Sequence, residues 1–119
     1  MALRVAYLPM RADAQALKGH LDTLLLASLE TGPRHGYAVR EALRQRGGAR
    51  FDLPTGTIYP ALRRLEAAGL VKGTWAEPDG QRRRRIYELT PAGRRRLAGD
   101  RVAWRDFASV VTAILEPAP

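Results

Sequence analysis

The sequence contains no cysteine, and this absence excludes several classes of protein at once. Without thiols, the chain has no disulfide framework, no thiolate metal site and no cysteine nucleophile. It has no apolar run of about 18 residues and no signal-peptide pattern, so we expect a cytoplasmic protein. His20 and His35 have no third metal ligand at suitable spacing, and no carboxylates are paired for acid–base catalysis. We therefore expect no metal, no cofactor and no enzymatic activity.

Lysine is almost absent, and acidic residues are outnumbered. Only Lys18 and Lys72 are lysines among the twenty Lys and Arg residues, and the formal net charge is +8. A basic chain favours polyanions, nucleic acid before anionic membranes. A GC-rich genome, which favours arginine codons, is an alternative origin of the arginine excess. The placement of the charge is more informative, because residues 81–96 hold seven arginines and only one acid, Glu88.

Three helices are predicted in the first part of the chain, after residues 1–12, which lack periodicity and are expected to form a flexible arm. Over residues 13–31, leucines recur at three- and four-residue spacing, and they cover more than one side of the predicted helix. Such a helix is buried on two sides or lies in an interface. A second helix is predicted over residues 36–46, with Tyr37 facing the core and Arg40 facing solvent. A third is predicted over residues 54–68.

Two short strands and a long helix are predicted to follow. The strands span residues 70–75 and 83–89, and the turn residues 77–80 separate them. Thr90 is the expected N-cap of a helix over residues 91–116. The apolar positions of this helix lie close to a coiled-coil seam, and its own chain offers nothing to cover them. A second copy of the chain is therefore expected to do so.

This order of elements predicts a mainly α fold with a small β-hairpin wing. Residues 13–90 would form a winged helix-turn-helix domain, and residues 91–116 would form a C-terminal dimerisation helix. The residues expected at the dimer interface are apolar and come from the first and last helices: Leu17, Leu21, Leu97, Trp104, Phe107, Ala108, Val111 and Leu115.

The third helix and the wing carry the residue types that bind DNA. A helix with short polar side chains near its N-terminus can enter the major groove and reach base edges. Arginines at a hairpin tip can follow a phosphate backbone or enter a narrow minor groove. Because side chains alternate along a strand, Arg82 and Arg84 are expected on one face and Arg83 and Arg85 on the other, so that only two of the four contact DNA directly. The residues expected to contact DNA are Thr55, Gly56, Thr57, Tyr59, Arg63, Arg64, Arg82, Arg83, Arg84 and Arg85.

Four sequence blocks carry a specific resemblance to a known family. They are Gly36-Tyr37, Gly56-Thr57-Ile58-Tyr59-Pro60-Ala61-Leu62-Arg63-Arg64-Leu65-Glu66, Gly69-Leu70-Val71 and Arg84-Arg85-Ile86-Tyr87-Glu88-Leu89-Thr90-Pro91-Ala92-Gly93. With these blocks, residues 17–115 resemble the PadR family of bacterial transcriptional regulators, in its short subfamily with one C-terminal helix. The chain departs from the family pattern at Gln81 and Arg83, where glycine and proline are more usual, and at Pro54, where a capping serine is common.

The resemblance implies a homodimeric repressor that binds an inverted-repeat operator and is released by a small aromatic or drug-like compound. It also implies that Tyr59 meets DNA and that Arg82 is the wing arginine. In some short members, a tryptophan fourteen residues after the strand-end threonine lines a drug-binding pore, and Trp104 stands at that distance from Thr90. Arg101 and Ala108, one helical turn to either side of Trp104, complete the effector site that this implies.

Two other functions are compatible with the residues alone. A winged-helix module can bind a protein partner without specific DNA binding, its charge then serving solubility. A nucleoid protein would bind DNA without sequence preference. Salt dependence distinguishes a DNA-binding protein from the protein-interaction module, and base mismatches distinguish a specific regulator from a nucleoid protein.

Overall fold

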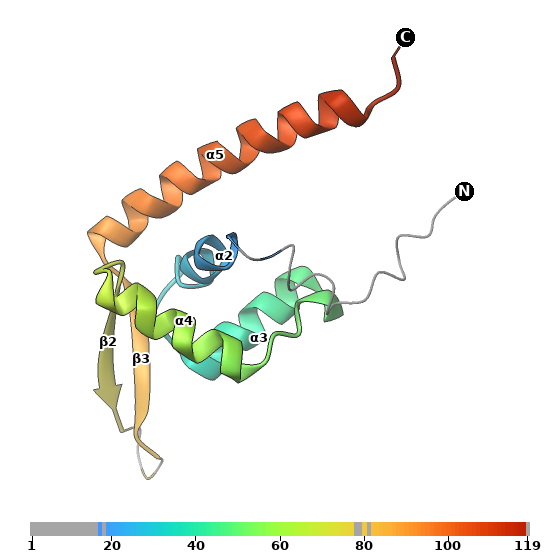
Figure 1. Ribbon diagram of the computed structural model, residues 1–119. Coiled ribbons are helices and arrows are strands. Elements are labelled where there is room, and N and C mark those ends of the chain that lie inside the picture. Colours follow the sequence, from blue (N-terminus) through green and yellow to red (C-terminus); the bar gives the residue numbers. More distant parts are fainter. Residues whose placement is uncertain (1–16, 18, 78–79, 81, 119) are drawn as a thin grey trace.

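The computed structural model of the chain describes residues 17, 19–77, 80 and 82–118. Three helices, α2 (Leu21–Ser28), α3 (Gly36–Gly47) and α4 (Thr55–Ala67), precede a hairpin and the 25-residue helix α5 (Pro91–Leu115) (Figure 1). The predicted mainly α fold with a β wing is confirmed. The predicted arm, residues 1–12, lies outside the described residues. Within them, no helix combines the length and apolar character that a membrane span requires.

The predicted first helix is wrong in its bounds. Leu17 is helical, but Gly19 and His20 form a turn, and α2 begins only at Leu21. Gly19 has a φ of 96°, a left-handed conformation that glycine adopts without steric cost and that interrupts a helix. At the other end α2 stops at Ser28 rather than at Thr31. The leucine periodicity identified the helix, and the backbone of a glycine determined where it starts.

The second helix agrees with its predicted span, but two side chains point the other way. Tyr37 is 50% exposed instead of facing the core. Arg40 is drawn inward, where its Nε donates to the Leu53 carbonyl at 2.7 Å and its Nη2 donates to Asp52 Oδ1 at 2.5 Å. These contacts tie α3 to η2 (Ala49–Phe51) and to the segment that leads into α4.

A three-stranded antiparallel sheet closes one side of the helices. The predicted hairpin consists of β2 (Val71–Ala76) and β3 (Arg84–Leu89), which pair from Val71↔Leu89 to Ala76↔Arg84. The sequence did not predict β1 (Arg34–His35), which pairs with the other edge of β3 in the order β1-β3-β2. Through β1, the start of α3 is fixed directly beside the wing.

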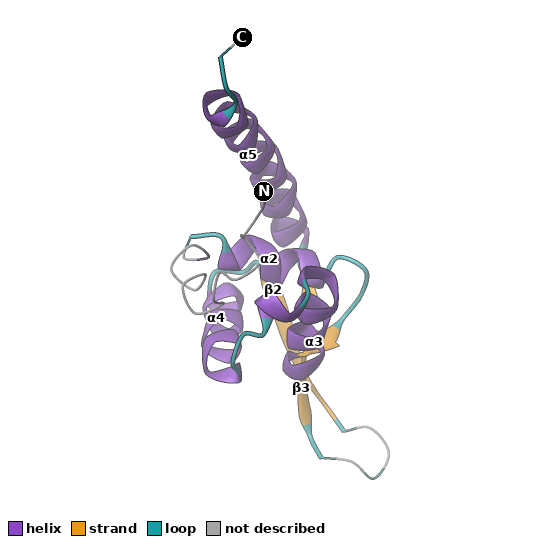
Figure 2. Ribbon diagram, turned by 90° about the vertical axis from the view of Figure 1, so that its right-hand side faces the viewer, coloured by secondary structure: helices purple, strands orange, loops and turns teal. Residues whose placement is uncertain are grey.

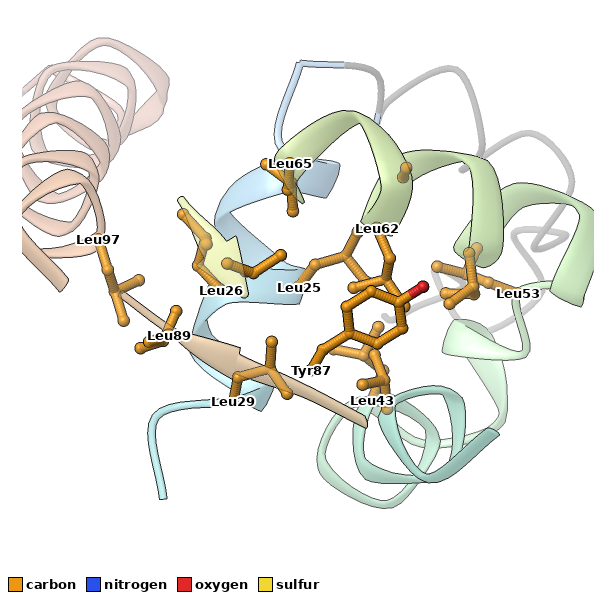
Figure 3. Packing of buried hydrophobic residues seen from close by; sticks show 14 residues of the cluster. Leu25, Leu26, Leu29, Leu43, Leu53, Leu62, Leu65, Tyr87, Leu89 and Leu97 are labelled. Carbon is orange, nitrogen blue, oxygen red and sulfur yellow. The ribbon is translucent and has the colours of Figure 1, made fainter. Parts of the chain in front are cut away.

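The hydrophobic core lies where the three helices meet the sheet (Figure 3). Leucines from α2, Leu43 from α3, Leu62 and Leu65 from α4, and Tyr87 and Leu89 from β3 contribute to it. Leu97 is the one residue of α5 in this cluster, and it is 2% exposed. The body of the fold therefore builds its core almost entirely without α5.

Helix α5 begins as the sequence predicted and then leaves the body. Thr90 caps it, because its Oγ1 accepts from the Gly93 N–H at 3.0 Å. Side-chain contacts to the body follow: Thr23 Oγ1 donates to Asp100 Oδ2 at 2.6 Å, and Arg101 makes two bonds to the Glu30 carboxylate. The C-terminal part of α5 rises away from the body, on the side that faces away from the wing tip (Figures 1 and 2).

Candidate nucleic-acid interface

The N-terminal turn of α4 presents short polar residues to solvent. Pro54 precedes the helix in an extended conformation, and its carbonyl accepts from the N–H groups of Thr57 and Ile58. Thr55, Gly56 and Thr57 are exposed, whereas Ile58 is fully buried. The exposed N–H end of a helix attracts anions, and small side chains allow a close approach. This turn has the shape and polarity required of a base-reading helix end.

Tyr59 anchors α4 against the start of α3. Its ring lies over Gly36, so that a Cβ at position 36 would stand 1.9 Å from Tyr59 Cε1. Any other residue at position 36 would displace the tyrosine. The Gly36-Tyr37 block and the Tyr59 block therefore depend on each other structurally, although 23 residues separate Gly36 from Tyr59.

A groove of about 880 Å³ runs between α4, the start of α3 and the hairpin. It combines positive charge with aromatic surface. Its lining residues are His35, Gly36, Tyr37, Tyr59, Arg63, Glu66, Trp75, Arg82, Arg83, Arg84, Arg85 and Tyr87. Five arginines against one carboxylate make the groove strongly electropositive, and Tyr59, Arg63 and Glu66 are the residues of α4 that line it. A polyanion is the partner that this field attracts.

Arg83 and Arg85 lie on one face of the wing and Arg84 on the other, as their alternation predicted. Arg83 and Arg85 both lie over the Trp75 ring, with guanidinium carbons 4.6 Å and 5.2 Å from its centroid. Arg84 points the other way, and its Nη1 lies 2.9 Å from His35 Nε2. Arg82, beyond the end of β3, is exposed. The four arginines are therefore held in different surroundings despite being consecutive.

His35 connects the wing to the N-terminus of α3. Its Nδ1 accepts from the Ala38 N–H at 3.2 Å and so caps the helix. Burial, and then the positive charge of Arg84, lower the pKa of His35. A neutral imidazole accepts at one nitrogen and carries a proton on the other, so Nδ1 can cap the helix only in the neutral ring. Protonation of Nδ1 would remove the cap and would add a positive charge beside Arg84. The neutral ring is thus the form that this position favours.

Not every predicted DNA-contacting residue is equally available. Arg63 is exposed and lines the groove. Arg64 is exposed but pairs with Asp22 of α2. Arg85 is half-buried and pairs with Glu66 of α4. Sequence reasoning missed the contributions of Glu66, His35 and Tyr37 to this site. Glu66 and Tyr37 lie within the family blocks, which were the only signal that pointed to them, and no sequence signal pointed to His35.

A second candidate surface lies on α5. Leu17 and Leu21 pack partly against the core, and Leu97 is buried in it, so Leu97 serves its own chain rather than the predicted interface. Arg101 is engaged by Glu30. Ala108 and Val111 are partly exposed. The large apolar side chains that remain half or more exposed are Val102, Trp104, Phe107, Val110, Ile114 and Leu115.

Three helices, with the third exposed at its N-terminal end, followed by a basic hairpin, define a winged helix-turn-helix protein. The profile described as "Transcriptional regulator PadR-like family" matches residues 25–99, more than half of the chain. The chain belongs to this family of transcriptional regulators, whose members are not enzymes.

Individual relatives support this assignment. The transcriptional regulator Rv3488 of Mycobacterium tuberculosis is 42% identical over 77 residues, which cover 65% of this chain and 68% of the relative. A 37.1 kDa protein of transposon TN4556 from Streptomyces fradiae is 43% identical over 93 residues. The match covers 74% of this chain but only a quarter of the Streptomyces protein, 25% of its length.

Solved structures share the fold. A PadR family transcriptional regulator from Eggerthella lenta superposes with a TM-score of 0.78 at 30% identity, covering 91% of this chain and 92% of the other. Bacillus subtilis PadR in complex with operator DNA superposes with a TM-score of 0.59 at 20% identity. That match covers 83% of this chain and 49% of the other, and it concerns the fold alone.

Proposed function

We propose that this transcriptional regulator is a homodimeric repressor that binds an inverted-repeat operator. The N-terminal turn of α4 enters the major groove, where Thr55 and Thr57 reach base edges and Gly56 allows close approach. Arg63 and the exposed wing arginines Arg82 and Arg84 contact phosphates. The observation that carries this proposal is the groove between α4 and the hairpin, which five arginines line. The operator complex of Bacillus subtilis PadR, which has the same fold, supports it.

The exposed face of α5 supports dimerisation. At about 3.6 residues per turn, Gly93, Leu97, Trp104, Val111 and Leu115 lie on one stripe. Its first two members are buried against the body, and the others continue it into solvent. The proposed occupant of the uncovered part is α5 of a second copy, because an isologous pairing buries both faces at once.

An aromatic cluster at the start of that surface is the proposed effector site. His20 meets Trp104 edge-on at 5.3 Å between ring centroids, and Phe107 lies 6.1 Å from Trp104. Such rings pack well against a planar aromatic compound. Binding of such a compound would change how the two copies are held relative to each other, and the dimer would then be released from the operator.

The first experiment is selection of bound sequences from a random duplex pool at about 150 mM salt, where specific binding typically exceeds non-specific binding about 10³-fold or more. The proposal expects an enriched inverted repeat with half-sites about one helical turn, or a multiple of it, apart. Binding without enrichment would favour a nucleoid protein, and absence of binding would favour a protein-interaction module.

Matched variants then test the groove. Arg82→Ala/Arg84→Ala is expected to weaken binding to every duplex and to reduce the salt slope by about 0.9 per lost phosphate contact. Arg46→Ala/Arg105→Ala removes two exposed charges that do not line the groove, and it serves as the control. Thr57→Ala should instead change the preferred base at one or two positions in each half-site. Equal effects of the two double variants would contradict the proposed site.

Sedimentation tests the dimer. Ile114→Asp places a charge in the apolar face, where Ile114 is 74% exposed, and is expected to give monomers. Ser109→Asp adds the same charge on the opposite side of α5, about 140° from Ile114, and should leave the assembly unchanged. A dimer that survives Ile114→Asp would mean that the copies meet elsewhere.

A further inference from the structure

An ion pair joins the wing to α4. Arg85 of β3 donates through Nη2 to Glu66 Oε2 of α4, and the two side chains are only 29% and 28% exposed. The Arg85 guanidinium also lies over Trp75, which is its partner residue across the β2–β3 ladder. A carboxylate from the helix and an indole from the neighbouring strand thus hold the same side chain.

The backbone of β2 is shaped to accommodate this pair. A Cβ at Gly73 would lie 2.7 Å from Arg85 Nε and 2.9 Å from Glu66 Oε2. These distances are shorter than real Cβ atoms show, so glycine leaves the space that the pair occupies. Residues of β2, β3 and α4 therefore meet at one point, at the base of the groove.

The neighbouring arginines differ from Arg85 in this respect. Arg82, Arg83 and Arg84 are all exposed, and the carboxylate that pairs with Arg83 among the described residues is Glu77, 3.8 Å away and 68% exposed. The charge of Arg85 is instead neutralised at close range by Glu66. A neutralised, half-buried guanidinium releases few counterions from DNA and reaches a phosphate poorly.

We propose that Arg85 is a positioning residue, which with Glu66 and Trp75 sets the orientation of the wing against α4, and that it does not contact phosphate. The alternation of side chains predicts that only two of the four consecutive arginines contact DNA directly, and this inference places Arg85 outside that pair. The expected effect on DNA affinity rests on the proposed DNA-binding function, whereas the expected effect on the orientation of the wing does not.

Glu66→Gln gives a prediction whose sign is decisive. If Glu66 were only a negative charge beside a DNA-binding groove, its removal would tighten DNA binding. If it holds the wing, removal loosens the wing and weakens binding by about fivefold, the value for a well-oriented surface ion pair. Glu77→Gln removes one carboxylate that pairs with the neighbouring wing arginine Arg83, and it is the matched control. It should leave affinity equal or slightly higher.

Gly73→Ala tests the positioning role of the Arg85–Glu66 pair without removing any charge. The added methyl would displace the pair without removing a cation or an anion. It should weaken binding as Glu66→Gln does, with the salt slope of the unsubstituted protein retained. A contact residue would behave differently, because its loss lowers the slope.

Acrylamide quenching of Trp75 fluorescence reports the wing in the absence of DNA. The full chain is used in a Trp104→Phe background, and sedimentation verifies an unchanged assembly. Greater quenching in Glu66→Gln and Gly73→Ala than in Glu77→Gln, together with weaker binding to the selected duplex, supports the proposal. Unchanged quenching, or tighter binding by Glu66→Gln, overturns it. If the unsubstituted chain binds no duplex, the proposed function fails, and the quenching alone decides the role of Arg85.

Discussion

The winged-helix body and α5 use apolar residues in opposite ways. In the body, leucines from all three helices and residues of both hairpin strands are buried together. In α5, only Gly93 and Leu97 among 25 residues are buried, and six large apolar side chains are half or more exposed. The body satisfies its own hydrophobic surface, whereas α5 displays a surface that its own chain does not cover. The stability contributed by the apolar face of α5 should therefore depend on protein concentration, whereas the stability contributed by the core of the body should not.

The largest expected effect follows from breaking the body. Leu62→Ala removes a fully buried side chain and should lower the free energy of unfolding by about 2–5 kcal/mol. Ile114→Ala should change it by less than about 0.5 kcal/mol in dilute solution, since Ile114 contacts little of its own chain. Urea denaturation at two protein concentrations checks both. The loss of unfolding free energy caused by Ile114→Ala should grow with protein concentration. A loss that stays constant would mean that α5 is covered by its own chain.

Two glycines within α5 should respond with opposite signs. A Cβ at Gly93 would lie 2.0 Å from the Leu70 carbonyl oxygen, so Gly93→Ala must push the helix off the body. Overpacking of this kind costs about 1–3 kcal/mol. A Cβ at Gly99 would have nothing within 4 Å, and Gly99→Ala should stabilise the helix by about 0.5–1 kcal/mol. Thermal unfolding of both variants makes the comparison. A stabilising Gly93→Ala would show that α5 is not docked where it starts.

The same contrast explains how much the sequence could predict. The start of α5 was predictable, because Thr90 and Pro91 have a local capping chemistry. The end of α4 was predictable from Gly69, which has a φ of 77°. The strand β1 was not predictable, because two residues have no periodicity and their partners on β3 lie about fifty residues away, as in Arg34↔Tyr87.

The arginine run shows the limit within the site. Counting charge treats Arg82 and Arg85 as equivalent, since both are cations in one basic segment. The fold brings Glu66 to Arg85 from 19 residues away, and because of that contact Arg85 is not one of the exposed arginines of the wing. Helical spacing predicts Tyr37 in the core for the same reason, because spacing alone does not report which face the neighbouring elements cover. Partners distant in sequence decide both cases.

A smaller effect is expected in the body from His35. Because its pKa is lowered, the unfolded chain binds the proton first as the pH falls. The stability contributed by neutral His35 is complete above its ordinary pKa of 6.5 and is lost as the pH falls from there through the lower folded value. His35→Asn keeps a capping acceptor and does not titrate, so its stability should fall less between about pH 7 and 5. Parallel pH profiles for the two proteins would contradict this role.

The smallest effect concerns the junction between the two regions. Glu30 accepts two bonds from Arg101, and that contact lowers the pKa of Glu30. Its contribution is present above the ordinary pKa of 4.5 and is lost as the pH falls through the lower folded value. Both groups are exposed enough for salt to screen them, so Glu30→Gln should change stability only slightly, and less at about 1 M salt. The informative measurement is the distance between spin labels on the body and on α5. A wider distribution in Glu30→Gln, at unchanged stability, would show that the pair sets the angle of α5, and an identical distribution would assign that angle to the other contacts of α5 with the body, among them Gly93, Leu97 and the Thr23–Asp100 hydrogen bond.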